Sequence, residues 1–159
     1  MKHLILPLLL LTLLLTACGR PTPAQSSQTP GFAPEVVDQL LACGAFSEPI
    51  DPLTPDIAWG LYHLSAAGLT REQMTDAVVY LSSGATCETV SLLTFTDETS
   101  AEIAVGALEE YCADQITANR DYRPMEITKL EQAQLIHRGN TLLLLIANDY
   151  TPALALLDP

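Results

Sequence analysis

The chain has 159 residues, of which 7 are basic and 19 are acidic, so its net charge is −12 and its pI is near 4.3. Such a chain is a poor ligand for nucleic acid or an anionic membrane surface, because binding to a polyanion requires clustered lysine and arginine. With 48% apolar and 16% charged residues, it is also too hydrophobic for intrinsic disorder and long enough to bury a core.

The chain opens with a positive residue and an apolar run. Lys2 precedes an apolar stretch of 14 residues, 4–17. A membrane span needs about 20 apolar residues, whereas the core of a signal peptide needs roughly 7 to 15. We therefore expect residues 1–17 to be a signal peptide rather than an anchor helix. Its removal takes one lysine from the 7 basic residues, which changes the net charge from −12 to −13.

The end of this segment has the pattern of a bacterial lipobox. Leu15, Thr16 and Ala17 give a branched apolar residue and two small residues directly before Cys18. In a lipoprotein the cysteine sulfur carries a diacylglyceryl group, and two acyl chains suffice for stable membrane anchoring. We therefore predict that Cys18 is lipidated and that the protein is held at the cell membrane, facing away from the cytoplasm. The alternative is an ordinary signal peptide that ends at Ala17 and is followed by a cysteine by chance.

A tether and a single domain are predicted after the signal peptide. Residues 18–34 combine the lipidated Cys18 with a segment rich in Pro, Ser, Thr and Gln. This composition cannot bury enough surface to offset its ordering entropy, and 16 extended residues reach at most roughly 50 Å. Its alternative is an ordered arm that packs on the domain. Residues 35–159 are expected to form one domain.

Two helices are predicted first in this domain. One begins at Pro34 and Glu35 and ends at Gly44, because proline suits the first helical position and glycine suits a C-terminus. The next segment, 47–55, contains three prolines and should be irregular. A second helix should begin at Thr54 and end at Gly68. Thr70 and Gln73 then have the spacing of a capping box.

Residue type predicts strands at 77–81 and 90–95, joined by a turn at 82–86. Asp97 should begin a helix of about 20 residues, because apolar residues recur at helical spacing and acidic residues occupy its first turn. The apolar stripe consists of Ala101, Ala104, Val105, Leu108, Tyr111 and Cys112. Residues 121–124 should end this helix.

A second hairpin and a closing helix complete the prediction. Strands at 134–137 and 141–147 are joined by Arg138, Gly139 and Asn140, and glycine tolerates the positive φ of a tight turn. Residues 142–146 are apolar on both faces, which places this strand inside the sheet. With a helix at 151–157, the predicted fold is α+β, with a mainly antiparallel four-stranded sheet and the order α-α-β-β-α-β-β-α.

Several of these segments together resemble a known family. The lipobox with Cys18, the short tether, residues 76–86, the long acidic helix and the turn at 138–141 look like a domain-of-unknown-function family of small lipoproteins from Gram-positive bacteria. The resemblance covers roughly residues 35–150 and is sharpest at residues 78–86. It implies a surface location and a fold, and it assigns no activity and no catalytic residue.

Candidate chemistry begins with the cysteines. Apart from Cys18, the three cysteines Cys43, Cys87 and Cys112 allow at most one internal disulfide. We expect them to pack as small hydrophobic thiols; a disulfide, and a metal or catalytic role, are the alternatives. The sequence leaves open a dyad of a cysteine with His63 or His137, because the two residues of such a dyad need not be close along the chain. The segment 82–84 is interpreted as a turn, because a strand rather than a helix follows it.

No catalytic, metal or cofactor site is predicted from these patterns. The acidic pairs 97–98 and 109–110 suit solvated helix faces better than a calcium loop. The favoured function is therefore a monomeric, non-enzymatic interaction or accessory module of the cell envelope, with an envelope protein or a small ligand as its partner. One alternative is a small-ligand binder with a pocket near Trp59, Tyr62 and Tyr80. The other is a cell-envelope hydrolase.

Overall fold

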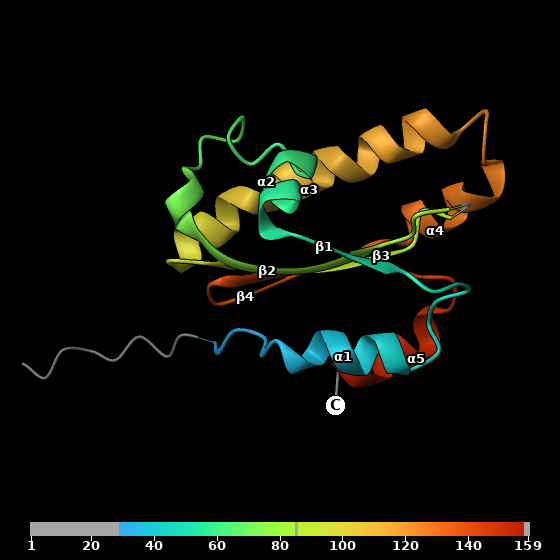
Figure 1. The fold of residues 1–159 in the computed structure, drawn as a ribbon, viewed down its shortest axis with the longest axis horizontal. Helices are drawn as coiled ribbons and strands as arrows, with labels where there is room; N and C mark the ends of the chain where they lie inside the picture. Colours follow the sequence, from blue (N-terminus) through green and yellow to red (C-terminus); the bar gives the residue numbers. More distant parts are fainter. Residues whose placement is uncertain (1–28, 85, 158–159) are drawn as a thin grey trace, which may run out of the picture.

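The computed structural model describes residues 29–84 and 86–157, so the signal peptide, the lipobox and Cys18 lie outside the described residues. The predicted α+β class is confirmed: a five-stranded antiparallel sheet separates two layers of helices (Figure 1). The elements are α1 (Glu35–Ala42), β1 (Asp51–Leu53), α2 (Pro55–Leu61), β2 (Met74–Leu81), β3 (Thr89–Phe95), α3 (Glu98–Asn119), α4 (Ile127–Glu131), β4 (Gln134–Arg138), β5 (Thr141–Ile146) and α5 (Tyr150–Leu157). Short 3-10 helices, η1 (Arg71–Gln73) and η2 (Pro124–Glu126), precede β2 and α4.

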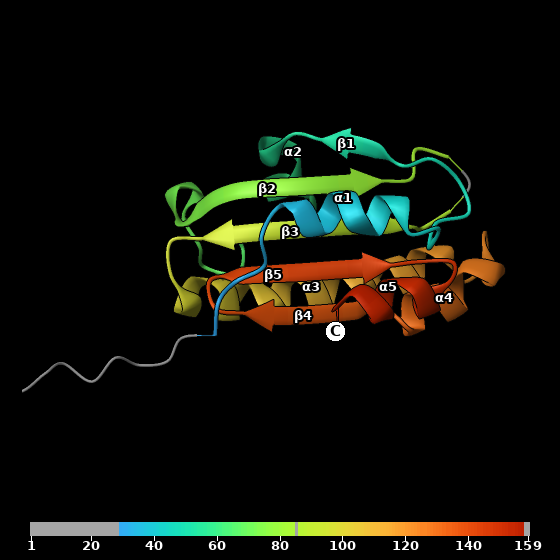
Figure 2. The same cartoon turned by 90° about the horizontal axis from the view of Figure 1, so that it is seen from below.

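The strand order is β1-β2-β3-β5-β4, with every neighbouring pair antiparallel (Figure 2). Helices α2, α3 and α4 cover one face of this sheet, and α1 and α5 cover the other (Figure 1). All six residues of β5 are buried, since the strand lies between β3 and β4 with a helical layer on each side. The predicted inner position of this apolar strand is therefore confirmed.

The sheet has one strand more than the four that were predicted. Residues 51–53 belong to the segment 47–55, which was expected to be irregular because of its three prolines; they form β1 and pair with residues 79–81 of β2. Pro52 is accommodated because β1 lies at the edge of the sheet, where a missing N–H need not interrupt a ladder on both sides.

One helix boundary and one additional helix also differ from the prediction. Helix α2 ends at Leu61 rather than near Gly68, because His63 adopts a left-handed φ of +49° that cannot continue a helix. Helix α4 was not predicted, since its five residues are too few for an apolar period to be recognised. With β1 included, the order of strands and α-helices becomes α-β-α-β-β-α-α-β-β-α.

Three local signals are confirmed. Asp97 caps α3, with its Oδ1 accepting a 2.7 Å hydrogen bond from the Ser100 N–H. The Thr70 N–H donates to Gln73 Oε1 at 2.8 Å, as a capping box requires. Gly139 opens the two-residue turn between β4 and β5 with a φ of +52°. Its left-handed conformation explains why glycine stands there.

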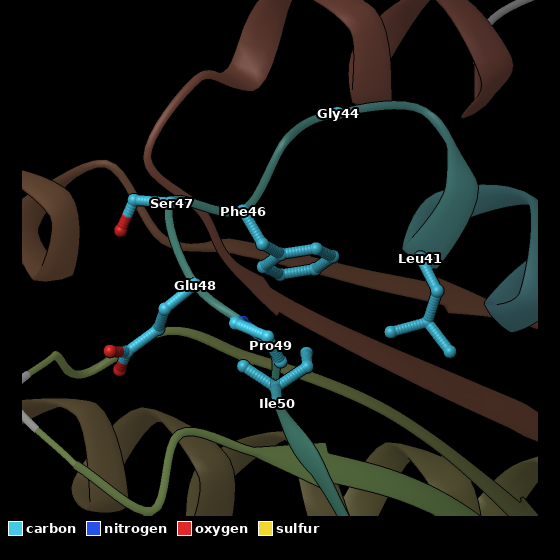
Figure 3. Close-up of a pocket in the computed structure, with 7 residues that line it drawn as sticks. All are labelled: Leu41, Gly44, Phe46, Ser47, Glu48, Pro49 and Ile50. Carbon is cyan, nitrogen blue, oxygen red and sulfur yellow. The ribbon is translucent and has the colours of Figure 1, made fainter.

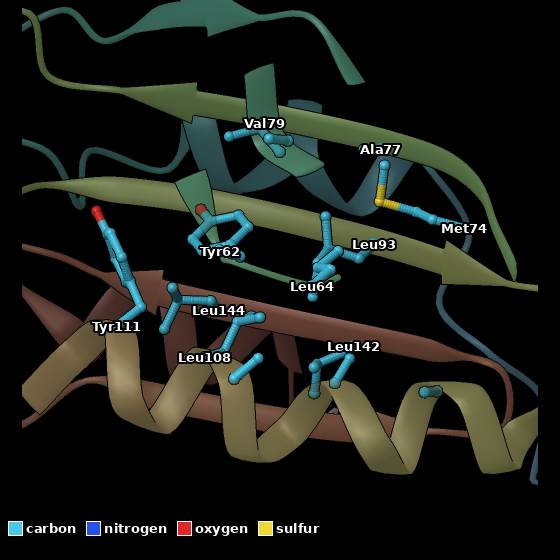
Figure 4. Close-up of a cluster of buried hydrophobic side chains, with 14 of the residues drawn as sticks. Tyr62, Leu64, Met74, Ala77, Val79, Leu93, Leu108, Tyr111, Leu142 and Leu144 are labelled. Atoms are coloured by element: carbon cyan, nitrogen blue, oxygen red, sulfur yellow. The ribbon is translucent and has the colours of Figure 1, made fainter. Parts of the chain in front are cut away.

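The core has two parts, one on each face of the sheet. The first lies between the sheet and α3, where residues such as Leu93, Leu108 and Leu144 are fully buried (Figure 4). The rings of Tyr62 and Tyr111 meet edge to face there, with their centroids 4.9 Å apart. The second part packs α1 and α5 against the opposite face. Both faces of the sheet are thus closed by helices.

The described part of the segment predicted as a tether, residues 29–34, lies against the turn between β4 and β5. The Phe32 N–H donates to Thr141 Oγ1 at 2.9 Å, and the ring packs against the second part of the core. The Arg138 guanidinium lies 4.4 Å from the centroid of that ring.

None of the helices in the described residues has the length and apolar character of a membrane span.

Candidate functional site

Charged side chains gather in the interior at the end of the sheet where β2 passes into β3. Glu88, directly before β3, is completely buried. Its Oε1 lies 2.8 Å from Lys129 Nζ and accepts a 2.5 Å hydrogen bond from Ser47 Oγ. Its Oε2 accepts a 2.8 Å bond from the Ser47 N–H. One carboxylate thus connects the loop after α1 with helix α4.

A second carboxylate binds the same ammonium group. Glu126 Oε1 lies 3.1 Å from Lys129 Nζ, and Glu126 Oε2 accepts a 2.9 Å bond from the Cys87 N–H. Burial lowers the pKa of Lys129, but the hydrogen bonds and charges of the two glutamates outweigh it and raise the pKa above its usual value. We refer to Glu88, Glu126 and Lys129 as the lysine cluster; its lysine stays charged at neutral pH.

Two further charged residues surround the lysine cluster. Glu48 Oε1 accepts hydrogen bonds from the hydroxyls of Ser82 and Thr86, and these bonds lower the pKa of Glu48. Arg123 donates from Nη1 to the Thr86 carbonyl at 3.1 Å and from Nε to Asn119 Oδ1 at 2.6 Å. Glu48 and Arg123 therefore both bind the segment between β2 and β3, next to the lysine cluster.

The charged residues of the lysine cluster are of types that occur in active sites, but their hydrogen bonds are all made to other groups of the protein. Within the described residues, every buried side-chain nitrogen and oxygen atom has a hydrogen-bond partner. Each carboxylate oxygen of Glu88 and Glu126 is engaged by a protein group. Such an arrangement suits a structural connection between three loops, since a substrate would have to displace an existing partner.

Two pockets flank the cluster. One, of about 440 Å³, is lined by Leu41, Gly44, Phe46, Ser47, Glu48, Pro49 and Ile50 (Figure 3). In Figure 3 the Glu48 carboxylate points away from the Phe46 ring. A smaller pocket of about 220 Å³ includes Ser83, Cys87, Tyr111 and Arg123 in its lining. The lining of neither pocket contains a histidine beside a nucleophilic side chain.

The cysteines of the described residues are free thiols, as was expected. Cys87 is buried, and the Cys43 thiol donates to the Leu40 carbonyl at 3.0 Å. Burial raises the pKa of Cys87, and it raises the pKa of Cys112 to about 11. Both thiols are protonated at neutral pH, which disfavours nucleophilic or metal-binding roles. Within residues 29–84 and 86–157, no three acidic, histidine or cysteine residues are placed to hold a metal ion.

The histidines and serines considered from the sequence do not come together. His63 lies in the turn after α2, whereas His137 Nε2 lies 2.7 Å from the Gly139 carbonyl oxygen at the other hairpin. Ser82 donates to Glu48, and Ser83 Oγ donates to Asp51 Oδ2 at 2.8 Å. The described residues therefore contain no hydrogen-bonded Cys–His or Ser–His pair.

The three aromatic residues predicted to line a ligand pocket do not share one. Tyr62 is fully buried on the α3 face, and its hydroxyl lies 2.5 Å from Ser91 Oγ. Trp59 packs against the same part of the core, with Arg71 5.9 Å from its ring centroid. Tyr80 packs against the part on the opposite face. The sheet therefore separates Tyr80 from the other two.

Sequence reasoning missed the lysine cluster. Glu88 directly precedes an apolar strand, and a charged residue at that place is the only local signal of a buried carboxylate. Lys129 and Glu126 are three residues apart, which is also typical of a solvated helix surface. Their partner is 41 residues from Lys129 along the chain, and only the fold shows that pairing.

Comparison with known proteins gives one match. The family DUF4358, described as a domain of unknown function, matches residues 66–147, which extend from the turns before β2 to the end of β5. No curated protein and no solved structure matches the chain. The matched range includes Glu88, Glu126 and Lys129 but excludes Ser47 and Glu48.

Proposed function

The chain belongs to the DUF4358 family of domains of unknown function, and we propose that it acts as a lipid-anchored, non-enzymatic interaction or accessory module outside the cytoplasm. The observation that carries this proposal is the lipobox, Leu15, Thr16, Ala17 and Cys18, directly after an apolar segment of signal-peptide length. A diacylglyceryl group on Cys18 anchors the chain stably, because two acyl chains exceed the threshold at which one chain binds only reversibly.

The non-enzymatic part of the proposal is supported by how the polar groups are used. The lysine cluster and its neighbours bind one another and the backbone of three loops. Catalysis requires a group that is poised to take or give a proton at a substrate, close to a nucleophile or an oxyanion site. Here the serine hydroxyls donate to carboxylates that are already engaged, and the pKa values of Cys87 and Cys112 are raised.

A small-ligand-binding lipoprotein is the second candidate. The pocket of about 440 Å³ beside Phe46 supports it, because its volume lies within the range of roughly 300 to 1,000 Å³ that is common for small-molecule sites. Its polar groups, Ser47 and Glu48, are occupied by Glu88 and by Ser82 and Thr86.

The location is tested with intact bacteria that produce the full-length protein. A protease added outside the cells should degrade the domain if it faces outward, while a cytoplasmic marker stays intact. Degradation only after the cells are lysed would contradict the extracytoplasmic location.

The non-enzymatic class is tested with the same protein and a fluorophosphonate probe, which labels activated serine nucleophiles. We expect no covalent labelling of Ser47, Ser82 or Ser83, since none is paired with a histidine in the described structure. Labelling that is lost in Ser47→Ala or Ser82→Ala would contradict this part of the proposal and favour a hydrolase.

A further inference from the structure

Strand β4 forms one edge of the sheet and pairs only with β5. The Phe95 N–H donates to the Asn140 carbonyl, and every second pair from there is hydrogen-bonded. The residues of β5 that bond to β3 are therefore Leu142, Leu144 and Ile146. Their neighbours in β5 bond to residues 134, 136 and 138 of β4. By this alternation, the N–H and carbonyl groups of Leu135 and His137 point out of the sheet.

Within the described residues, nothing pairs with these outward groups. No hydrogen bond joins the backbone N–H or carbonyl of Leu135 or His137 to another described residue, and Figure 2 shows no element beyond β4 in the plane of the sheet. The opposite edge differs, because β1 has only three residues and contains Pro52. Short strands, prolines and charged side chains block edge pairing. Strand β4 has no proline, and its one charged residue, Arg138, is bound to the Leu157 carbonyl at 2.7 Å.

An apolar groove lies beside the open edge. It has a volume of about 440 Å³ and lies on the α3 face of the sheet, between α3, α4 and the start of β4. Its lining includes Cys112, Ile116, Leu130 and Leu135. Leu135 thus contributes a side chain to the groove and outward-facing backbone groups to the edge. An added strand would place alternate side chains over this groove.

The acidic side chains that line the groove favour a partner with basic side chains. The lining contains two carboxylates, Glu109 and Glu131, and no basic residue. A second copy of the chain would bring another net charge of −12, which opposes self-association. An extended segment with apolar and basic side chains satisfies both the backbone edge and the acidic groove.

We propose that β4 binds an extended segment of a partner protein that joins the sheet as a further strand and that presents both apolar and basic side chains at the alternate positions facing the groove. The backbone of Leu135 and His137 supplies the hydrogen bonds. The groove beside Ile116 takes the apolar side chains, and Glu109 and Glu131 attract the basic ones. This inference deepens the proposed function, since it names the surface and the partner of the interaction module.

The probe is a short synthetic peptide, here called the valine–lysine peptide, titrated into the full-length protein in mild detergent. Valine and lysine take turns at every second position and threonine fills the positions between them, so that both can face the groove. Hydrogen–deuterium exchange should show new protection at the amides of Leu135 and His137. The amides of residues 134, 136 and 138 are already bonded to β5 and should change little. A peptide with N-methyl groups at the residues facing β4 serves as the matched control, and it should bind roughly tenfold more weakly or not at all.

Two protein variants test the two parts of the surface. His137→Pro removes an outward N–H while the bonds from β4 to β5 remain possible, so peptide affinity should fall about tenfold. Glu109→Lys combined with Glu131→Lys leaves the backbone intact and should weaken the valine–lysine peptide but strengthen a valine–glutamate peptide. The melting temperature of each variant shows whether it has folded.

Equal binding of the N-methylated peptide, or protection that appears outside residues 133–138, would overturn the proposal. A preference of the unmodified protein for the valine–glutamate peptide would overturn the charge argument, and dimerisation through β4 would replace the partner with a second copy. Peptide binding does not depend on Cys18. Failure here therefore leaves the lipid anchor untouched, and failure of fatty-acid labelling leaves this result untouched.

Discussion

Lys129 Nζ lies 2.8 Å from Glu88 Oε1, and this contact joins α4 to a completely buried carboxylate at the start of β3. Glu126 shares the same ammonium at 3.1 Å. Placing a charge in a protein interior is costly unless it is paired and hydrogen-bonded, so each member of the lysine cluster depends on the others. The cluster therefore matters for stability chiefly when one partner is lost.

Lys129→Met should destabilise the protein by about 3 to 5 kcal/mol, because it leaves the Glu88 carboxylate buried without its counter-ion. The urea midpoint of unfolding measures this loss. Asp56→Asn is the matched control, since it removes the 2.9 Å Arg71–Asp56 pair, whose side chains are 41% and 87% exposed, and keeps the bond from Arg71 Nη1 to the Met74 carbonyl. That variant should change the midpoint little, because exposed pairs contribute little. A loss in Lys129→Met no larger than in the control would contradict the role given to the cluster.

Stability should also fall at alkaline pH. Burial raises the pKa of Tyr62 from 10.0 to about 12 in the folded protein. The unfolded chain therefore releases this proton near pH 10, while the folded protein keeps it until about pH 12. Stability is unaffected below pH 10 and decreases as the pH rises from 10 to 12, by up to about 3 kcal/mol from Tyr62. The raised pKa values of Lys129 and Tyr150 act in the same direction.

Urea unfolding of Tyr62→Phe across this pH range measures how much of the alkaline loss of stability is due to Tyr62. The variant loses the hydrogen bond to Ser91 at every pH, but its further loss between pH 10 and 12 should be smaller than that of the unmodified protein. Tyr122→Phe is the control, because Tyr122 is 89% exposed. Parallel pH profiles for Tyr62→Phe and the unmodified protein would show that Tyr62 does not govern alkaline stability.

Gly139→Val should lower the melting temperature by several degrees. The φ of +52° disfavours any residue with a Cβ, and a Cβ at this position would lie 2.5 Å from the Thr29 carbonyl oxygen. Each kcal/mol corresponds to about 4 to 8 °C in a domain of up to roughly 100 residues and to less in a larger one. Gly106→Ala in α3 is the control, since nothing lies within 4 Å of its added Cβ. It should raise the melting temperature slightly, and a loss at Gly106 equal to that at Gly139 would contradict this account.

The arm at residues 29–34 should contribute to stability. The sequence led us to expect that residues 35–159 fold alone as a monomer, because the preceding segment is poor in apolar residues. In the structure the Phe32 N–H binds Thr141 and its ring packs against the core. A chain of residues 29–159 should therefore be more stable than 35–159 by about 1 to 3 kcal/mol. Phe32→Ala in the longer chain should remove much of that difference, and equal urea midpoints for all three would show that the arm adds nothing.

The parts of the fold that were predictable are those with a strong local pattern. The long helix after Asp97 and the leucine strand 142–146 follow from periodicity, and the turn at Gly139 follows from its residue type. Strand β1 was missed because Pro52 and the two prolines that flank the strand argue against a strand until its edge position is known. The lysine cluster was missed because Glu88 and Lys129 meet only through the fold.

The proposed location at the membrane depends on lipidation of Cys18. Cells that produce the full-length protein should incorporate labelled fatty acid into it, and the protein should be found in the membrane fraction. Cys18→Ala should abolish the labelling, because alanine has no sulfur to accept the diacylglyceryl group. The unlipidated precursor then keeps its signal segment or is cut near Ala17 by ordinary signal peptidase. Cys43→Ala, Cys87→Ala and Cys112→Ala are matched controls and should leave the labelling intact, since none of these cysteines follows an apolar export segment. Labelling that persists in Cys18→Ala would contradict the lipobox, and the proposed location would lose its support.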